Sequence, residues 1–166
     1  RTNIMHLNIY LHSIITKLKE KNQILLIGID GPTAAGKTTL ADNLSKRLKK
    51  KFNVFIFRLD WTLKDRKSRE DSLKNFKKFN KDFYFEAEDH MNLDKTEEFL
   101  KKIKLFNKSN KKETSLILNN LYDRSGSAKN DLQVRTKIDH NTIIFVEGHY
   151  SGYQNIYEHL DYNILL

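Results

Sequence analysis

Apolar residues recur along this chain with two periods, one typical of helices and one of buried strands. Between Leu7 and Leu18 they return every three or four positions, which predicts an amphipathic helix. Packing on the domain core is the better interpretation of this helix, and binding of a partner is the alternative. The run QILLIGID, residues 23–30, is apolar over a strand's length, which is typical of a strand buried on both faces of a parallel sheet.

The next segments continue this alternation. Leucines at intervals of four from Leu40 to Leu48 predict a helix that runs to about residue 51. NVFIFRLD, residues 53–60, predicts a second buried strand with an acid at its carboxyl end. Residues 61–81 are strongly charged and weakly periodic, which indicates a mobile segment or short helices.

The second half of the chain predicts a helix and a hairpin. Apolar positions between residues 93 and 106 suit a helix, with Asn92 or Asp94 as its cap. After the lysine-rich loop NKSNKKET, residues 115–123 and 132–138 have the composition of strands, and the turn-forming RSGSAKN separates them. We therefore expect a hairpin.

Two further apolar runs complete the predicted fold. TIIFVEG, residues 142–148, and YNILL, residues 162–166, predict buried strands. The alternation of strands and helices predicts an α/β fold, a parallel sheet with helices on both faces. No internal repeat and no linker rich in Pro, Gly or Ser divides the chain, so we predict one domain over residues 1–166, with its N-terminal helix in residues 1–22. Because the chain stops on an apolar strand, we expect it to continue beyond Leu166.

Composition narrows the class of protein. A chain of 166 residues, 39% of them hydrophobic, can bury one core of ordinary size. No apolar run reaches the roughly 18 residues that a membrane span needs, and the first twenty residues lack a cleavage site for a signal peptide. The absence of cysteine excludes disulfides and thiolate metal sites. We expect a soluble, cytoplasmic protein without a membrane partner.

The net charge of +9 indicates an anionic partner, either nucleic acid or a phosphorylated small molecule. The lysines are scattered over the chain and no basic motif is interleaved with aromatic residues, so a solvated lysine-rich surface explains the charge better than a nucleic-acid groove. His90 has no second histidine at ligand spacing, and we predict no structural zinc.

One motif carries specific chemistry. GPTAAGKT, residues 31–38, fits G-x-x-x-x-G-K-[ST] between a predicted strand and a predicted helix, the context that a P-loop requires. Glycines let the backbone approach phosphate oxygens, the lysine reaches the β and γ phosphates, and the threonine hydroxyl binds Mg²⁺. We expect a nucleoside triphosphate to bind Gly31, Ala34, Ala35, Gly36, Lys37, Thr38 and Thr39.

Two acids follow predicted strands and are candidates for the remaining chemistry. Asp60 comes after VFIFRL, and Glu147 comes after IIFV. The carboxyl ends of parallel strands meet at one edge of a sheet, so both acids should lie beside the loop. An acid at a strand end can also cap a helix or solvate a turn. Two acids on either side of a P-loop strand favour a functional role.

Five segments together resemble the uridine kinase and phosphoribulokinase family of P-loop kinases, in order and spacing from about Ile24 to Leu166. They are GIDGPTAAGKTTLADNL, FIFRLDWTLKDRKSR, FEAEDHMNLDKTEEFL, LYDRSGSAKNDLQVRTKI and TIIFVEGHYSGY. The resemblance implies a three-layer fold of the nucleoside-monophosphate-kinase type. It also implies transfer of the γ-phosphoryl group of ATP, with Mg²⁺, to a hydroxyl of a small molecule.

The same resemblance implies roles for individual residues. Asp60 matches the acid that accepts the proton of the attacking hydroxyl, with Lys37 on the phosphates, and Glu147 matches the acid on the Mg²⁺ side together with Thr38. The implied acceptor-binding residues are Arg66, Asp89 and Tyr122, with Arg69, His90 and Asp123 beside them. A core or hairpin-packing role for Tyr122 is an equal alternative.

Two departures from the family pattern bear on function. Uridine and cytidine kinases have a histidine shortly after the YD pair that reads the base, and YDRSGSAKN has none. Family members also continue past the last strand into a lid helix with phosphate-binding arginines and then a further strand, which do not occur within residues 1–166.

Three hypotheses about function remain open. The leading one is an ATP-dependent small-molecule kinase of the uridine kinase type, with a phosphoribulokinase-like, pantothenate or other metabolite kinase as its nearest rival. The second is a nucleotide-binding regulatory module that phosphorylates no acceptor. Nucleic-acid binding through the positive charge ranks last.

Overall fold

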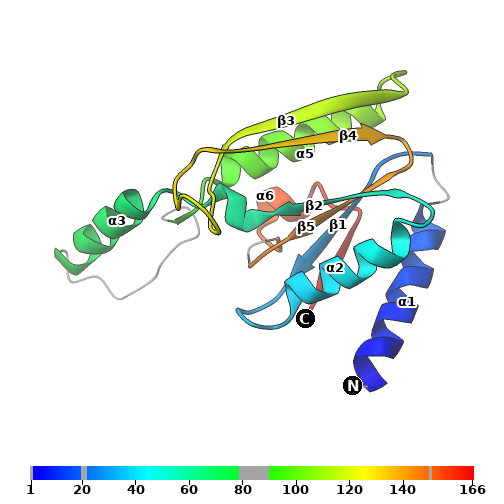
Figure 1. Cartoon of the computed structure of the whole chain (residues 1–166), viewed down its shortest axis with the longest axis horizontal. Helices are drawn as coiled ribbons and strands as arrows, with labels where there is room; N and C mark the ends of the chain where they lie inside the picture. Colours follow the sequence, from blue (N-terminus) through cyan, green and yellow to red (C-terminus); the bar gives the residue numbers. More distant parts are fainter. Residues whose placement is uncertain (1, 20–21, 79–89, 150) are drawn as a thin grey trace.

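A parallel sheet of four strands lies at the centre of the fold (Figure 1). The computed structural model describes residues 2–19, 22–78, 90–149 and 151–166. Each apolar run that predicts a strand of this sheet is a strand in the structure. In spatial order they are β2 (Asn53–Arg58), β5 (Thr142–Glu147), β1 (Leu25–Asp30) and β6 (Tyr162–Leu165).

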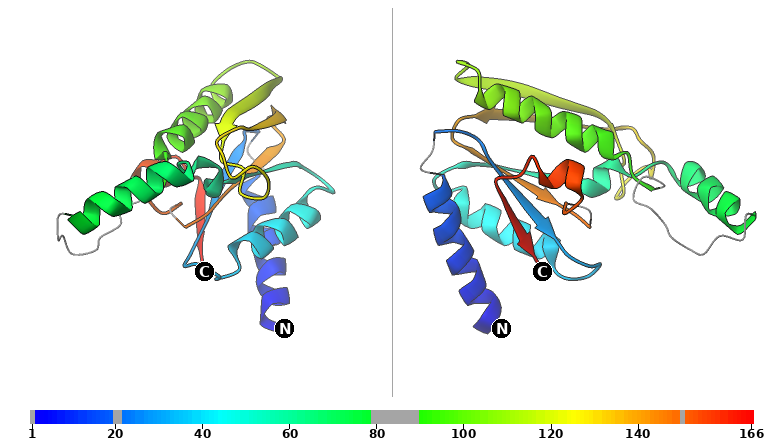
Figure 2. Two further views of the ribbon diagram at one scale, coloured as in Figure 1. Left: turned by 60° about the vertical axis from the view of Figure 1, so that its left-hand side comes forward. Right: turned by 180° about the vertical axis from the view of Figure 1, so that it is seen from behind.

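Helices cover both faces of the sheet, which confirms the predicted α/β fold (Figures 1 and 2). On one face lie α1 (Thr2–Leu18) and α2 (Lys37–Leu48), and on the other lie α5 (Leu93–Asn107) and the short α6 (Gln154–Tyr157). Helix α2 ends three residues earlier than its leucine spacing predicts, and residues 49–51 form a turn in which the Lys51 and Phe52 amides donate to the Leu48 carbonyl.

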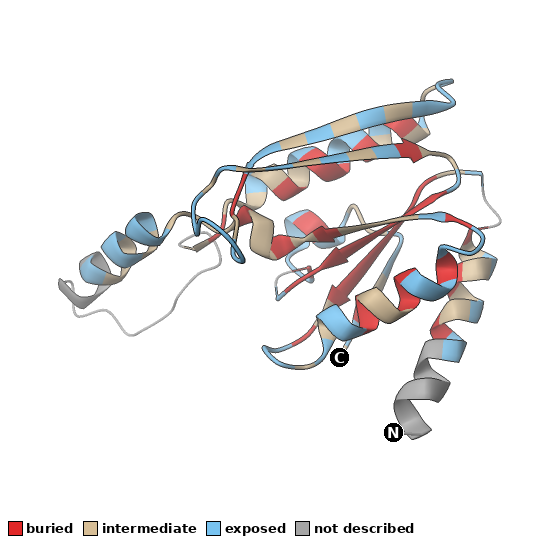
Figure 3. Ribbon diagram, in the orientation of Figure 1, coloured by how far each residue is buried: buried red, intermediate tan, exposed pale blue. Residues whose placement is uncertain are grey.

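Each face of the sheet has its own hydrophobic core. Alternate residues of β1, such as Ile27, pack against α1 and α2, while their neighbours, such as Leu26, pack against α5 and α6. Leu26 and Ile27 are fully buried, and most other residues of β1 and β5 are buried as well (Figure 3). Each such side chain contributes about 1.5–3 kcal/mol through its removal from water, so the central strands form a rigid support for the loops at their ends.

The predicted hairpin is confirmed, and it lies beside α5 over one face of the sheet (Figures 1 and 2). Its antiparallel strands are β3 (Glu113–Leu121) and β4 (Leu132–Asp139), so β3 begins two residues before the predicted start. The pairing is irregular between Leu118 and Leu121, where Asn120 has a φ of 54°.

The charged segment after β2 forms short helices, one of the two predicted alternatives, as far as the structure describes it. A 3-10 helix η1 (Leu59–Thr62) is followed by α3 (Arg66–Lys78), which extends away from the sheet (Figure 1). Asp65 caps α3 by accepting hydrogen bonds from the backbone N–H and the hydroxyl of Ser68. These bonds lower the pKa of the Asp65 carboxyl, the backbone bond most strongly.

No helix in the described part of the chain combines the length and the apolar content needed to cross a membrane.

Candidate active site

The loop between β1 and α2 has the backbone that its glycines predict. Gly31 and Gly36 have φ values of 148° and 89°, a region that side chains rarely adopt. A Cβ on Gly31 would also lie 2.9 Å from the carbonyl oxygen of Leu166. Ala34, with a φ of 64°, takes a left-handed turn as well. The loop therefore turns back on itself before α2 begins at Lys37.

The ammonium of Lys37 lies over this loop. Its Nζ donates hydrogen bonds to the carbonyls of Gly31, at 2.9 Å, and Pro32, at 2.7 Å. No side chain of the described residues caps α2 at Gly36. The first-turn amides of α2 and the Lys37 ammonium thus form a cationic end to the loop, of the kind that binds phosphate oxygens.

Thr38 and Glu147 meet directly beside the loop. The Thr38 hydroxyl donates to Oε1 of Glu147 at 3.0 Å, and the Glu147 side chain is only 8% exposed. Hydroxyl and carboxylate oxygens are the ligand types that Mg²⁺ takes in proteins, so this pair fits the metal. Among the residues that the structure describes, no group of three or more His, Asp or Glu forms a metal site. A Mg²⁺ ion here would therefore take further ligands from phosphates and water.

Arg58, which the sequence analysis missed, completes the surroundings of Glu147. Its guanidinium bridges Oε2 of Glu147, at 3.2 Å, and the Asp42 carboxylate of α2, at 3.0 Å. Arg58 is the last residue of β2 and lies opposite Glu147 in the register of β2 and β5. A sequence signal was present, because Arg58 ends one predicted strand and Glu147 ends another.

A second group of contacts fixes the start of the loop. The Asp30 carboxylate accepts hydrogen bonds from the backbone N–H groups of Gly31 and Gly152, both at 2.8 Å. His149 Nδ1 lies 3.2 Å from the Gly31 carbonyl oxygen. The segment after β5 is thereby tied to the loop. Asp30 was also missed, although an acid directly before the first glycine was visible in the motif.

Asp60 lies in the first turn of η1, directly after β2. Its side chain is 47% exposed and forms an ion pair with Arg124, a residue of the connection between β3 and β4. Because β1, β5 and β2 are adjacent and parallel, the loop, Glu147 and Asp60 follow one another along the same edge of the sheet. The acids at the ends of the predicted strands indicate this arrangement from the sequence.

The predicted acceptor residues have different surroundings. The Arg66 side chain is 80% exposed and pairs with Glu70 at 2.8 Å. Tyr122 is buried, and its hydroxyl accepts a hydrogen bond from Arg69 at 3.1 Å. The Arg69 guanidinium also lies over the Tyr122 ring. Asp89 lies outside the described residues.

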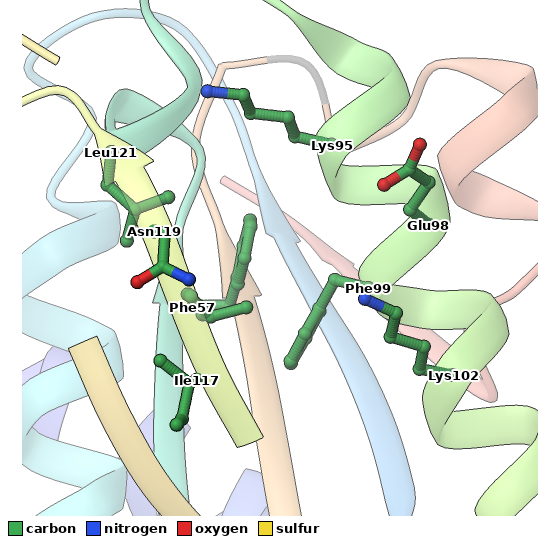
Figure 4. Close-up of a pocket in the computed structure, with 9 residues that line it drawn as sticks. Phe57, Lys95, Glu98, Phe99, Lys102, Ile117, Asn119 and Leu121 are labelled. Carbon is green, nitrogen blue, oxygen red and sulfur yellow. The ribbon is translucent and has the colours of Figure 1, made fainter. Parts of the chain in front are cut away.

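A pocket between β3 and α5 contains none of these residues (Figure 4). Its floor is formed by the rings of Phe57 and Phe99, stacked with their centroids 4.5 Å apart. Lys95, Glu98 and Lys102 of α5 lie around it. This pocket lies between the hairpin and the helix and is distinct from the edge that carries the loop.

The loop between β1 and α2 on a parallel sheet defines the class of this chain as a P-loop protein. The model of the phosphoribulokinase / uridine kinase family matches residues 26–166, and the chain belongs to this family. A search of curated proteins gave no significant match.

Solved structures with the same fold include several kinases at low sequence identity. A possible uridine kinase from Bacillus stearothermophilus is 19% identical with a TM-score of 0.60, and the match covers 95% of this chain and 78% of that one. A putative fructose transport system kinase from Silicibacter sp. TM1040 is 14% identical with a TM-score of 0.59, covering 93% and 73%. Identities this low support the fold alone.

Proposed function

We propose that this chain transfers the γ-phosphoryl group of ATP to a hydroxyl of a small molecule. The observation that carries the proposal is the order of groups along one edge of the sheet. A phosphate-binding loop, a buried carboxylate and a half-exposed carboxylate follow three neighbouring parallel strands. These are the parts that phosphoryl transfer requires, since catalysis consists of positioning and of charge stabilisation.

The loop side would hold the nucleotide. The amides of residues 31–39 and the Lys37 ammonium would bind the phosphates, and the ammonium would leave the loop carbonyls that it contacts. Thr38 and Glu147 would hold Mg²⁺, which supplies positive charge to the β and γ phosphates. Arg58 would keep Glu147 turned toward Thr38.

The other side would hold the acceptor and its base. Asp60 would accept the proton of the acceptor hydroxyl as that oxygen bonds to the γ phosphorus and ADP leaves. Such a base contributes about 10²–10⁴ in rate. We propose an acceptor site between the segment of residues 61–90 and the hairpin, with Arg66, Asp89 and Tyr122 as candidate contacts.

Alternatives remain within this proposal. The acceptor is either a nucleoside or another metabolite, as in a phosphoribulokinase-like or pantothenate kinase. The alternative to a kinase is a regulatory module that binds ATP and phosphorylates no acceptor. We further propose a cytoplasmic location, because a chain without cysteine needs no oxidising compartment.

The test is ADP release from ATP and Mg²⁺ over a panel of acceptors that includes uridine, ribulose 5-phosphate and pantothenate. Asp60→Asn should lower acceptor-dependent ADP release by about 10²-fold or more and leave ATP binding intact. Lys37→Ala should weaken ATP binding, whereas Lys46→Ala, on the exposed side of α2, is the matched control. Tight ATP binding without ADP release over the whole panel would favour the regulatory module.

A further inference from the structure

Arg124 lies on the acceptor side of the proposed site, in the connection between β3 and β4, and pairs with Asp60. We infer that Arg124 is a specificity-determining residue, which binds a carboxylate or phosphate that the acceptor carries near its reacting hydroxyl. The inference rests on the proposed function, because it takes Asp60 as the base.

The connection between β3 and β4, which contains Arg124, is held at both ends by hydrogen bonds to the segment around Asp60. The Tyr122 backbone N–H donates to the Trp61 carbonyl at 2.8 Å. On the other side, the Asn130 amide donates to the Leu63 carbonyl at 2.8 Å. These two bonds place the backbone of Arg124 next to Asp60 whether or not the two side chains pair.

Inside the loop, Asp123 supplies the internal hydrogen bonds. Its carboxylate accepts from the backbone N–H groups of Gly126, at 2.9 Å, and Ser127, at 3.2 Å. These contacts, with Ser127 foremost, lower the pKa of the Asp123 carboxyl. Asp123 is therefore engaged in shaping the loop, and it leaves the neighbouring Arg124 with Asp60 as its carboxylate partner.

A contribution to folding stability does not explain why Arg124 pairs with Asp60. The two side chains are 74% and 47% exposed, and ion pairs this open contribute little to folding. The contact involves one nitrogen of the guanidinium. A guanidinium has five N–H donors in a planar fork that suits carboxylate and phosphate oxygens, so Arg124 can bind an anion next to Asp60.

The charged residues near Asp60 and Arg124 favour an anionic acceptor. Among the described residues, the nearby carboxylates already have partners: Asp65 caps α3 and Glu70 pairs with Arg66. Arg69 lies over Tyr122, and within the described part of the chain it forms no ion pair with a carboxylate. Arg124 thus pairs with Asp60, the same acid that must receive the acceptor hydroxyl. An acceptor with its own negative charge would pair with the Arg124 guanidinium while Asp60 receives the hydroxyl.

A first experiment tests the anion site without knowledge of the acceptor. In Asp60→Asn, Arg124 loses its partner and should bind inorganic phosphate more readily. The melting temperature of this variant should rise with phosphate by about 2–4 °C more than that of the double variant Asp60→Asn with Arg124→Ala. Phosphate binding at the P-loop is common to both and cancels. Equal responses would overturn the inference.

A second experiment identifies which anion the site takes. ADP release is compared for D-glycerate against glycerol and for ribulose 5-phosphate against ribulose, so that carboxylate and phosphate are tested separately. Arg124→Ala should lower kcat/KM for the preferred anionic acceptor by about 10- to 100-fold and change the neutral counterpart little, with partial rescue by Arg124→Lys. Arg135→Ala, an exposed arginine of the same hairpin, is the control.

The outcomes separate the two proposals. Equal use of neutral and anionic acceptors, or an equal loss on both in Arg124→Ala, would overturn the inference and leave the kinase function standing. No ADP release with any acceptor, together with the phosphate response of Asp60→Asn, would support the anion site and count against the kinase function.

Discussion

The hydroxyl of Thr38 donates a hydrogen bond to Oε1 of Glu147 at 3.0 Å, although 109 residues separate them in the chain. The register of β1 and β5 explains the meeting, because Ile29 and Glu147 are partners at the carboxyl edge and the loop leads from β1 to the first turn of α2. With its proton directed to Glu147, the Thr38 oxygen keeps lone pairs for a cation.

Thr38→Val should remove both the hydrogen bond to Glu147 and the proposed Mg²⁺ ligand. We expect the Mg²⁺ concentration at half-maximal ADP release to rise by about 10-fold or more. Thr38→Ser retains the hydroxyl and should stay close to wild type. Titration of Mg²⁺ at saturating ATP gives the measurement, and an unchanged Mg²⁺ requirement in Thr38→Val would count against the assigned metal side.

Arg58→Gln should leave the buried Glu147 carboxylate without its cationic partner. We expect a loss of about 1–3 kcal/mol in the free energy of unfolding, seen in chemical denaturation, together with a changed Mg²⁺ requirement. Asp42→Asn removes only the outer, more exposed contact of Arg58 and should cost less than about 1 kcal/mol. If both substitutions had the same effect, Arg58 would not act through Glu147.

Gly148→Ala should disturb Asp60 through its neighbour. A Cβ on Gly148 would lie 2.5 Å from the Cβ of Leu59, which is fully buried and directly precedes Asp60. The clash should cost about 1–3 kcal/mol in stability and shift η1, so that acceptor-dependent ADP release falls more than ATP affinity. Thermal unfolding and separate titrations of ATP and acceptor measure the two effects. Equal losses in both titrations would show that η1 does not move independently of the loop.

The elements that the sequence predicts best are those with continuous or regularly spaced apolar residues. β1, β5 and α2 belong to this group because burial alone determines them. Helix α3 has mostly charged residues and no apolar stripe, so its periodicity left helix and mobile segment as alternatives. The irregular pairing near Asn120 depends on backbone geometry that residue types do not reveal. The single domain stays a prediction.

The residues of the candidate site also fall into those that the sequence predicts and those that it does not. The loop residues and the positions of Asp60 and Glu147 follow from local motifs and from the rule that parallel strands share an edge. Arg58 and Arg124 were missed because their partners are set by strand register and by the anchoring of the hairpin connection, and Arg124 lies 64 positions after Asp60 in the chain. The catalytic and binding roles themselves stay predictions.

A buried lysine at the end of α1 gives a prediction about pH. The Lys19 ammonium contacts the carbonyls of Gln23 and His140 and thereby ties α1 to β1 and to the turn between β4 and β5. Lys19 is 7% exposed, and the loss of water lowers its pKa below the ordinary value of 10.5, with Asp139 and Asp161 acting in the opposite direction.

Lys19→Met should therefore change how stability depends on pH. In the range just below pH 10.5, the unfolded wild-type chain binds more protons at Lys19 than the folded chain, so this group makes folding more favourable as pH rises. Lys19→Met lacks the group, and the stability difference between wild type and variant should shift in favour of wild type as the pH is raised toward 10.5. Urea denaturation at several alkaline pH values measures this slope, with Lys17→Met on the exposed side of α1 as the control. A difference that is constant with pH would mean that Lys19 keeps its ordinary pKa in the folded chain.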